Sequence, residues 1–254
     1  NHGGILRTVN TKTDFTLDID AISNAVNSKT KAVIINSPNN PTGQIYSEES
    51  LNVLGYLLES KGKTFNRTIY LISDEPYRKI IYDGLNMPGI FICYKESLIA
   101  ASYSKDLSFA GECIGFAAVN PELTFKEEIL EGLVLANRIL GFVNAPALMQ
   151  RVIASLQGVS VNISEYERKR GILCEGLTNC GYEFIKPAGA FYLFPKSPVP
   201  VDIKFIQMLQ EELILAVPGS GFGAPGYFRI AFCVDDKTII NSFSGFKRAM
   251  DRIA

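Results

Sequence analysis

The sequence predicts an α/β fold with a mainly parallel sheet in a larger first domain, residues 1–150, and a smaller α+β domain, residues 151–254. The larger domain is predicted from two continuous apolar, β-branched runs, residues 31–36 and 68–73, that flank a helical pattern. This strand–helix–strand order is typical of parallel strands that are covered on both faces. The smaller domain is predicted from short aromatic, strand-like runs that follow Gly181.

The other elements of the first domain follow from the spacing of apolar residues. The central helix is expected to begin after Ser47, a good N-cap, and to end at Gly62. Strands are also expected at residues 4–9, 98–101 and 114–119, and helices at residues 18–26, 125–140 and 146–156.

The second domain is expected to alternate short strands with helices. Its strands are predicted at residues 189–194, 213–217 and 227–232, and its helices at residues 163–177, 203–209 and 239–250. Residues 221–226 match the pattern G-x-G-x-x-G, but Pro225 would break the helix that a dinucleotide-binding loop must open. We therefore interpret this stretch as a turn between two strands.

Composition restricts the function. The chain has 254 residues, a formal net charge of -1 and 47% hydrophobic residues, so it offers no electrostatic argument for nucleic acid or an anionic membrane. No apolar run approaches the ~20 residues of a membrane span. The five cysteines are scattered without a C-x-x-C pair, which favours a reducing, cytoplasmic location. The single histidine, His2, is too close to the terminus to predict histidine-based catalysis or a zinc site.

Polar side chains follow three of the predicted strands. Asn40 comes after the strand at 31–36, Asp74 and Tyr77 after the strand at 68–73, and Ser102 and Lys105 after the strand at 98–101. Ligands of parallel sheets bind outside the carboxyl ends of the strands. The sequence therefore predicts a binding site at this edge.

Lys105 suggests the chemistry of that site. A lysine that is partly desolvated at a strand end has a lowered pKa, and its neutral amine can form a Schiff base with an aldehyde. Ser102 offers a hydroxyl donor to an anion such as a phosphate. Taken singly, these residues have simpler interpretations: Lys105 could extend to water, Asp74 could cap a helix, and Tyr77 could pack in the core.

Four motifs in order along the chain resemble the class I/II aminotransferases of fold type I, which depend on pyridoxal 5'-phosphate (PLP). They are Asn39-Asn40-Pro41-Thr42-Gly43, Asp74-Glu75-Pro76-Tyr77, Ser102-x-Ser104-Lys105 and Tyr227-Phe228-Arg229-Ile230. Residues 189–195 and 217–223 are also similar to members that resemble aspartate aminotransferase. The resemblance implies the aspartate aminotransferase-like fold with an incomplete large domain.

The resemblance also implies roles for the matching residues. Lys105 would hold PLP as an internal aldimine and act as general base and acid in the 1,3-proton shift between Cα and C4'. Asp74 would keep the pyridine nitrogen protonated. Tyr77 would bind the phenolic O3' of the cofactor. Together these three residues are the expected catalytic group.

Binding roles are implied for the remaining positions. Asn40 would also bind O3', while Ser102 and Ser104 would donate to the phosphate. Arg229, with Asn40 beside it, would bind the substrate α-carboxylate through its guanidinium fork. As a lone strand residue, Arg229 would more often be part of a surface ion pair.

The sequence departs from the family at two places. Cys113 stands where members usually have an arginine that pairs with the PLP phosphate, and a thiol cannot replace that contact. Members also carry an N-terminal portion that precedes the stretch matched here. The resemblance therefore implies that this chain is the C-terminal part of a homodimeric parent, and we expect it to be weakly active or inactive alone.

Three functions remain open at this point. The first is an aminotransferase that moves an amino group from an amino acid to a 2-oxo acid. The second is a PLP-dependent carbon–sulfur β-lyase, which shares the same cofactor contacts. The third is a non-catalytic descendant that only binds a ligand or partner, which Cys113 and the missing portion favour and the intact Lys105 opposes.

Overall fold

The computed structural model describes residues 3–253 and divides into two compact units. Unit 1 comprises Asn1–Ser37, Tyr46–Arg78 and Met87–Ser160, and unit 2 comprises Pro38–Ile45, Lys79–Asn86 and Val161–Ala254. Each unit draws on more than one stretch of the chain, and the linear boundary predicted at residue 150 stays a prediction. His2 lies outside the described residues.

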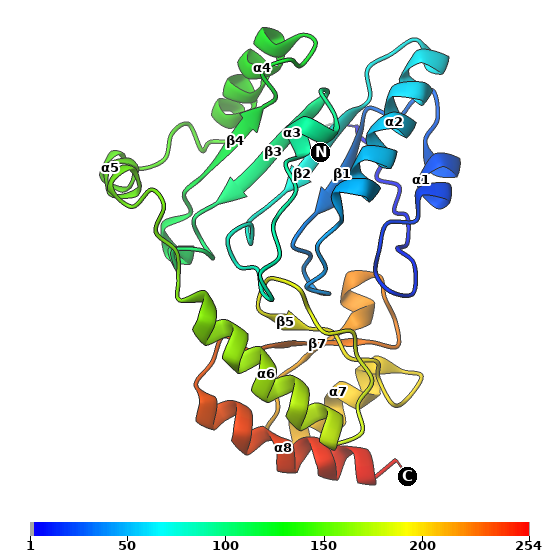
Figure 1. Cartoon of the computed structure of the whole chain (residues 1–254), viewed down its shortest axis with the longest axis vertical. Coiled ribbons are helices and arrows are strands. Elements are labelled where there is room, and N and C mark those ends of the chain that lie inside the picture. The colour runs from blue at the N-terminus through cyan, green and yellow to red at the C-terminus, as the bar shows by residue number, and fades with distance from the viewer. Residues whose placement is uncertain (1–2, 254) are drawn as a thin grey trace. The chain divides into compact units, whose positions relative to one another are not determined.

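Unit 1 contains a four-stranded sheet in the order β1-β2-β3-β4 (Figure 1). The strands β1 (Ala32–Asn36), β2 (Tyr70–Asp74) and β3 (Ser97–Ser102) are parallel, and β4 (Gly115–Val119) runs antiparallel to β3. The predicted α/β fold with a mainly parallel sheet is thus confirmed. In this register Asn36 pairs with Asp74, and Asp74 pairs with Ala100, so the carboxyl ends of the three parallel strands share one edge.

Two helices of unit 1 begin after short polar side chains that cap them. Asp18 accepts a hydrogen bond from Ala21 N (2.9 Å) ahead of α1, and Ser47 accepts one from Ser50 N (3.1 Å) ahead of α2. The helices are α1 (Ile19–Ala25), α2 (Glu48–Phe65), α3 (Ile90–Cys93), α4 (Lys126–Ile139) and α5 (Ala147–Ser155), with the 3-10 turn η1 at Ala110–Glu112. The helix α2 continues past Gly62 and ends at Phe65, with Asn66 as its C-cap. The strand predicted at residues 4–9 is wrong, because that stretch has no regular structure.

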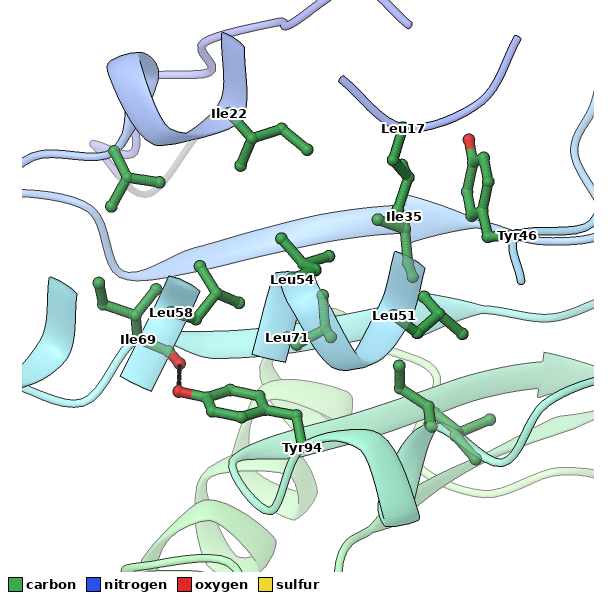
Figure 2. Close-up of a cluster of buried hydrophobic side chains, with 13 residues drawn as sticks. Leu17, Ile22, Ile35, Tyr46, Leu51, Leu54, Leu58, Ile69, Leu71 and Tyr94 are labelled. Atoms are coloured by element: carbon green, nitrogen blue, oxygen red, sulfur yellow. Dashed lines mark hydrogen bonds between the residues drawn. The ribbon is translucent and has the colours of Figure 1, made fainter. Parts of the chain in front are cut away.

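The core of unit 1 lies between α2 and the sheet (Figure 2). Leu51, Leu54 and Leu58 recur on one face of α2, and each is at most 1% exposed. The buried hydroxyl of Tyr94 donates to the carbonyl of Ile69 at 2.8 Å, just ahead of β2. This packing fixes the strands whose carboxyl ends carry the polar residues.

Unit 2 is built on a three-stranded antiparallel sheet in the order β5-β7-β6. The strands are β5 (Tyr192–Leu193), β6 (Val217–Pro218) and β7 (Phe228–Ala231), and the helices are α6 (Ile163–Asn179), α7 (Asp202–Glu211) and α8 (Asp236–Asp251), with the 3-10 turn η2 at Gly219–Phe222. The two short strands cover little of the predicted ranges 189–194 and 213–217. The second range begins with Leu213 at a φ of 60°, a left-handed conformation that an extended strand excludes.

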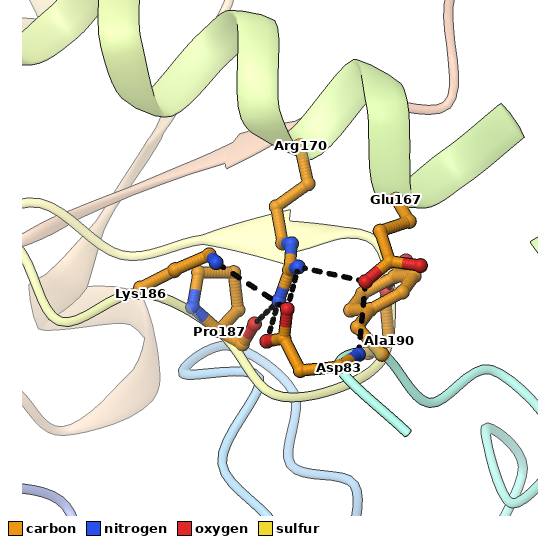
Figure 3. A network of polar contacts seen from close by, with 7 residues as sticks. Asp83, Glu167, Arg170, Lys186, Pro187 and Ala190 are labelled. Atoms are coloured by element: carbon orange, nitrogen blue, oxygen red, sulfur yellow. Dashed lines mark hydrogen bonds and ion pairs between the residues drawn. The ribbon is translucent and has the colours of Figure 1, made fainter. Parts of the chain in front are cut away.

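A buried arginine joins three segments of unit 2 (Figure 3). Arg170 of α6 has a side chain that is 2% exposed, and it donates to both carboxylate oxygens of Asp83, each at 2.7 Å. It also donates to the carbonyl of Pro187 at 2.8 Å and lies over the ring of Tyr82 at 4.5 Å. The guanidinium holds the pKa of Asp83 well below its usual range. Segment Lys79–Asn86 is thereby attached to α6 and to the loop before β5.

Within residues 3–253, no helix combines the length and the apolar character that a membrane span requires.

Candidate active site

A carboxylate and an amide meet at the carboxyl edge of the sheet in unit 1. Asp74 ends β2 and Asn36 ends β1, and the Asn36 Nδ2 group donates to Asp74 Oδ2 and to the Asp74 carbonyl, both at 3.0 Å. Burial raises the pKa of the half-buried Asp74 carboxyl, and the hydrogen bond from Asn36 opposes that rise. Asp74 is therefore held in place as an acceptor with one donor already supplied by the protein.

The turn after β2 fixes Tyr77. Glu75 N donates to the Ala100 carbonyl at 2.8 Å, which continues the pairing with β3 beyond Asp74. The Glu75 carboxylate is fully buried, and its Oε2 accepts from Arg78 Nη1 at 2.6 Å. Tyr77, only 3% exposed, lies between these two anchored residues in the sequence. The backbone that carries Tyr77 is thus held close to the end of β2, and its side chain is buried.

Ser102, Ser104 and Lys105 leave the end of β3 in a tight turn. All three are half-buried. The turn is attached to β4, because Tyr103 N donates to the Ile114 carbonyl at 3.0 Å. Gly115 pairs with Ser102, and a Cβ at Gly115 would lie 2.4 Å from the Ala101 carbonyl, so only glycine allows this close approach. Since β2 and β3 are neighbours, unit 1 brings the five predicted residues to one sheet edge.

Cys113 follows this turn in the sequence, at the position where the resemblance leads one to expect an arginine, and its thiol carries no positive charge. It follows η1 with a left-handed φ of 49°, and its side chain is exposed. Its thiol donates only to the Ala110 carbonyl, at 3.6 Å.

Unit 2 brings together the other two predicted residues, Asn40 and Arg229. The loop Pro38–Ile45 contains a cis peptide between Asn40 and Pro41, and Arg229 lies on β7. Arg229 Nη1 donates to Asn40 Oδ1 at 2.9 Å. Gly43 closes the loop at a φ of 69°, where a Cβ would lie 2.3 Å from the Pro187 Cβ. The loop that presents Asn40 therefore depends on a glycine.

Two aromatic rings also contact the guanidinium of Arg229. Its Cζ lies 4.5 Å from the ring centre of Tyr192 and 4.8 Å from that of Phe222. The Nε atom is buried and has no hydrogen-bond partner among residues 3–253. A buried donor without an acceptor is rare in folded proteins, and it marks a position where a ligand can supply one.

Sequence reasoning missed Asn36, Tyr192 and Phe222. A usable signal existed for Asn36, because it ends a predicted strand next to the strand that ends in Asp74. Tyr192 and Phe222 lie in the stretches 189–195 and 217–223 that resemble the family, but those stretches gave neither residue a role, because the contacts with Arg229 depend on strand pairing and on the η2 turn.

The comparisons with known proteins place this chain and its fold in one enzyme family. Residues 1–242 match the family model described as Aminotransferase class I and II, and the chain belongs to this family. The family predicted from the motifs is therefore confirmed.

Individual relatives show the same relationship. The chain is 29% identical to the aspartate/prephenate aminotransferase of Thermus thermophilus over 98% of its own length and 65% of the relative's, and 30% identical to the aspartate aminotransferase of Bacillus subtilis, of which it covers 62%. Its structure matches an amino transferase from Eubacterium rectale with a TM-score of 0.93 and 43% identity, over 96% of this chain and 62% of that one. The predicted aspartate aminotransferase-like fold is confirmed, and the chain spans less than two thirds of the length of these relatives.

Proposed function

We propose that this chain carries the lysine and the main cofactor- and substrate-binding residues of a PLP-dependent aminotransferase, which moves an amino group from an amino acid to a 2-oxo acid. The observation that carries the proposal is the edge of unit 1. There Asp74, in register with β3, lies beside the strand whose end leads through Ser102 to Lys105. Membership of the class I and II family supports the same reaction.

The residues at this edge fit the ring of the cofactor. When bound, PLP supplies an aldehyde carbon and an electron-accepting pyridine ring. Lys105 Nζ is the group that would bind the aldehyde carbon and that would remove and return the proton at the substrate Cα. The Asp74 carboxylate would hold a proton on the pyridine nitrogen, and Asn36 stabilises the charged form of Asp74 that this requires. Tyr77, together with Asn40, would donate to the phenolic oxygen.

The phosphate would be held without an arginine at position 113. Ser102 and Ser104 offer hydroxyl donors in the turn after β3, and they are half-buried. The exposed thiol of Cys113 adds no charge. We therefore infer that phosphate binding rests on neutral donors on this side and is weaker than a bidentate guanidinium contact would make it.

Arg229 and Asn40 would bind the substrate. The buried Nε of Arg229 has no partner among residues 3–253, and Asn40 holds a different nitrogen of the same guanidinium. A carboxylate of the amino acid or 2-oxo acid fits such a donor edge, since a guanidinium matches carboxylate geometry.

We further propose that the parent protein is a homodimer in a reducing, cytoplasmic environment. Helix α4 has no buried residue, and its Val134, Leu135 and Ile139 are 58%, 58% and 67% exposed. An apolar helix face of this kind is typical of a surface that packs against another chain or segment. None of the five cysteines forms a disulfide among the described residues, which supports the proposed compartment.

Covalent trapping tests the proposal. The chain is incubated with PLP, reduced with borohydride and digested, and the modified lysine is identified by mass spectrometry. We expect the label on Lys105, and we expect Lys105→Ala to remove it while Lys29→Ala, at an exposed position, leaves it unchanged. Label that persists in Lys105→Ala would contradict the proposed role.

A further inference from the structure

The guanidinium of Arg229 contacts two aromatic rings in addition to its hydrogen bond with Asn40, and these rings have no role in the function proposed so far. Tyr192 is 7% exposed on β5, and Phe222 ends the η2 turn. Both ring centres lie within the ~6 Å at which a cation is attracted to an aromatic face. These two contacts come from segments on either side of β6 in the sequence.

We propose that Phe222, with Tyr192, is a positioning residue that fixes the plane of the Arg229 guanidinium and keeps its Nε edge ready for a carboxylate. This inference rests on the proposed function, because it assigns the mechanism by which the substrate-binding arginine is oriented. Asn40 Oδ1 accepts from Nη1 at 2.9 Å and fixes one edge of the group. The rings restrict rotation of the group about that hydrogen bond, so the edge that carries the buried, unpartnered Nε keeps one orientation.

The ring of Phe222 is itself fixed by packing. Phe194, which is 2% exposed, meets Phe222 edge-on with ring centres 6.2 Å apart and an angle of 89° between planes. Phe194 in turn stacks on Tyr227 at 5.2 Å. The η2 turn that carries Phe222 begins at Gly219, where a Cβ would lie 2.3 Å from the Ala224 carbonyl. The position of Phe222 is therefore determined before any ligand binds.

Preorganisation of this kind increases affinity because the arginine loses less conformational freedom when the carboxylate arrives. Asn40 alone fixes one nitrogen and leaves the guanidinium plane free to rotate. Removal of the Phe222 ring should therefore leave the charge of Arg229 unchanged and increase only the mobility of its guanidinium group. This separates a positioning role from a charge role.

The test measures the order of the Arg229 side chain directly. The Nε–H resonance of Arg229 is assigned in the ligand-free chain by its loss in Arg229→Lys, and its order parameter is measured by 15N relaxation. We expect a value near the ~0.85 of rigid backbone, falling below ~0.6 in Phe222→Leu. Phe222→Tyr, which keeps the aromatic face, should retain the rigid value. Phe142→Leu, at a side chain that is 71% exposed, is the matched control.

A second measurement follows the binding of acetate at constant ionic strength, with methyl acetate as the uncharged comparison. We expect Phe222→Leu to weaken acetate binding about 5-fold and Phe222→Tyr to restore it. If the order parameter of Arg229 Nε–H is unchanged in a folded Phe222→Leu variant, the positioning role is overturned, whatever the affinity for acetate. Acetate binding that survives Arg229→Lys would instead contradict the substrate role of Arg229 in the proposed function, so the two failures are distinguishable.

Discussion

Replacing Asn36 tests whether the amide controls the charge state of Asp74. Asn36→Leu keeps a similar side-chain volume but removes both donations from Nδ2, to Asp74 Oδ2 and to the Asp74 carbonyl at 3.0 Å. A hydrogen bond to a charged group contributes about 1.5–3 kcal/mol. Because Asp74 is only half-buried, we expect the lower end of this range, about 1.5 kcal/mol, and the loss of the Asn36 hydrogen bond should raise the pKa of Asp74 further.

The sign of the pH dependence follows from burial. Burial already raises the pKa of Asp74 in the folded state, and Asn36 opposes this rise. A carboxyl whose folded pKa lies above its unfolded value destabilises the folded state once it is ionised. Asn36→Leu should therefore lower the free energy of unfolding by about 1.5 kcal/mol more at pH 7 than near the unfolded-state pKa of about 3.9. The lost donation to the carbonyl adds a component that does not change with pH.

Two measurements check this expectation. The Asp74 pKa is followed by 13C NMR of its carboxyl carbon, and the free energy of unfolding is measured in urea at pH 7 and pH 4. Asn241→Leu, at an exposed position on α8, is the matched control and should leave both quantities unchanged. An Asp74 pKa that stays the same or falls in Asn36→Leu would refute the reasoning, as would an equal loss of stability at both pH values.

Three further results are expected. Gly43→Ala should destabilise unit 2 by about 2–4 kcal/mol in urea unfolding, because alanine is strained at a φ of 69° and its Cβ would clash with Pro187; a loss below about 1 kcal/mol would show that the loop relaxes freely. Arg170→Met should cost about 1–2 kcal/mol at pH 7, after discounting for the 44% exposure of the Asp83 side chain. The lowered pKa of Asp83 stabilises the fold above the unfolded pKa, so this loss should shrink as pH falls below about 4, and a pH-independent loss would exclude the ion pair as its cause. Cys113→Arg should tighten PLP binding about 10-fold in a fluorescence titration, and an unchanged affinity would mean that other groups hold the phosphate.

Local sequence patterns predicted much of the fold because they reflect interactions between residues that are close together in the chain. Leu51, Leu54 and Leu58 have the spacing of one buried helix face, and Ser47 caps that helix as expected. The β-branched run at 31–36 became β1, as β-branched residues favour, although Ile35 is buried while Ile34 on the other face is 64% exposed, so the expected cover on both faces is wrong for this strand. These features depend on residues only a few positions apart, so they can be recognised directly in the sequence.

The failures share a different cause. Residues 4–9 contain the apolar and β-branched residues of a plausible strand, yet a strand forms only where a partner offers its backbone groups, and no pattern within six residues encodes that partner. The contact of Phe222 with Arg229 likewise depends on the pairing of β6 with β7 and on the η2 turn. The motif around Arg229 therefore identified the charged group but not the rings that orient it.

Asn36 and Asn40 show why this short segment uses amides. One amide donates its NH2 to the carboxylate of Asp74, while the other presents its oxygen to the guanidinium of Arg229. A carboxylate at position 36 would repel Asp74, and one at position 40 would neutralise Arg229 and compete with an incoming carboxylate. A neutral amide orients either charge without cancelling it. Because only Ser37, Pro38 and Asn39 separate the two amides in the sequence, the end of a single strand and the stretch that follows it supply both of them.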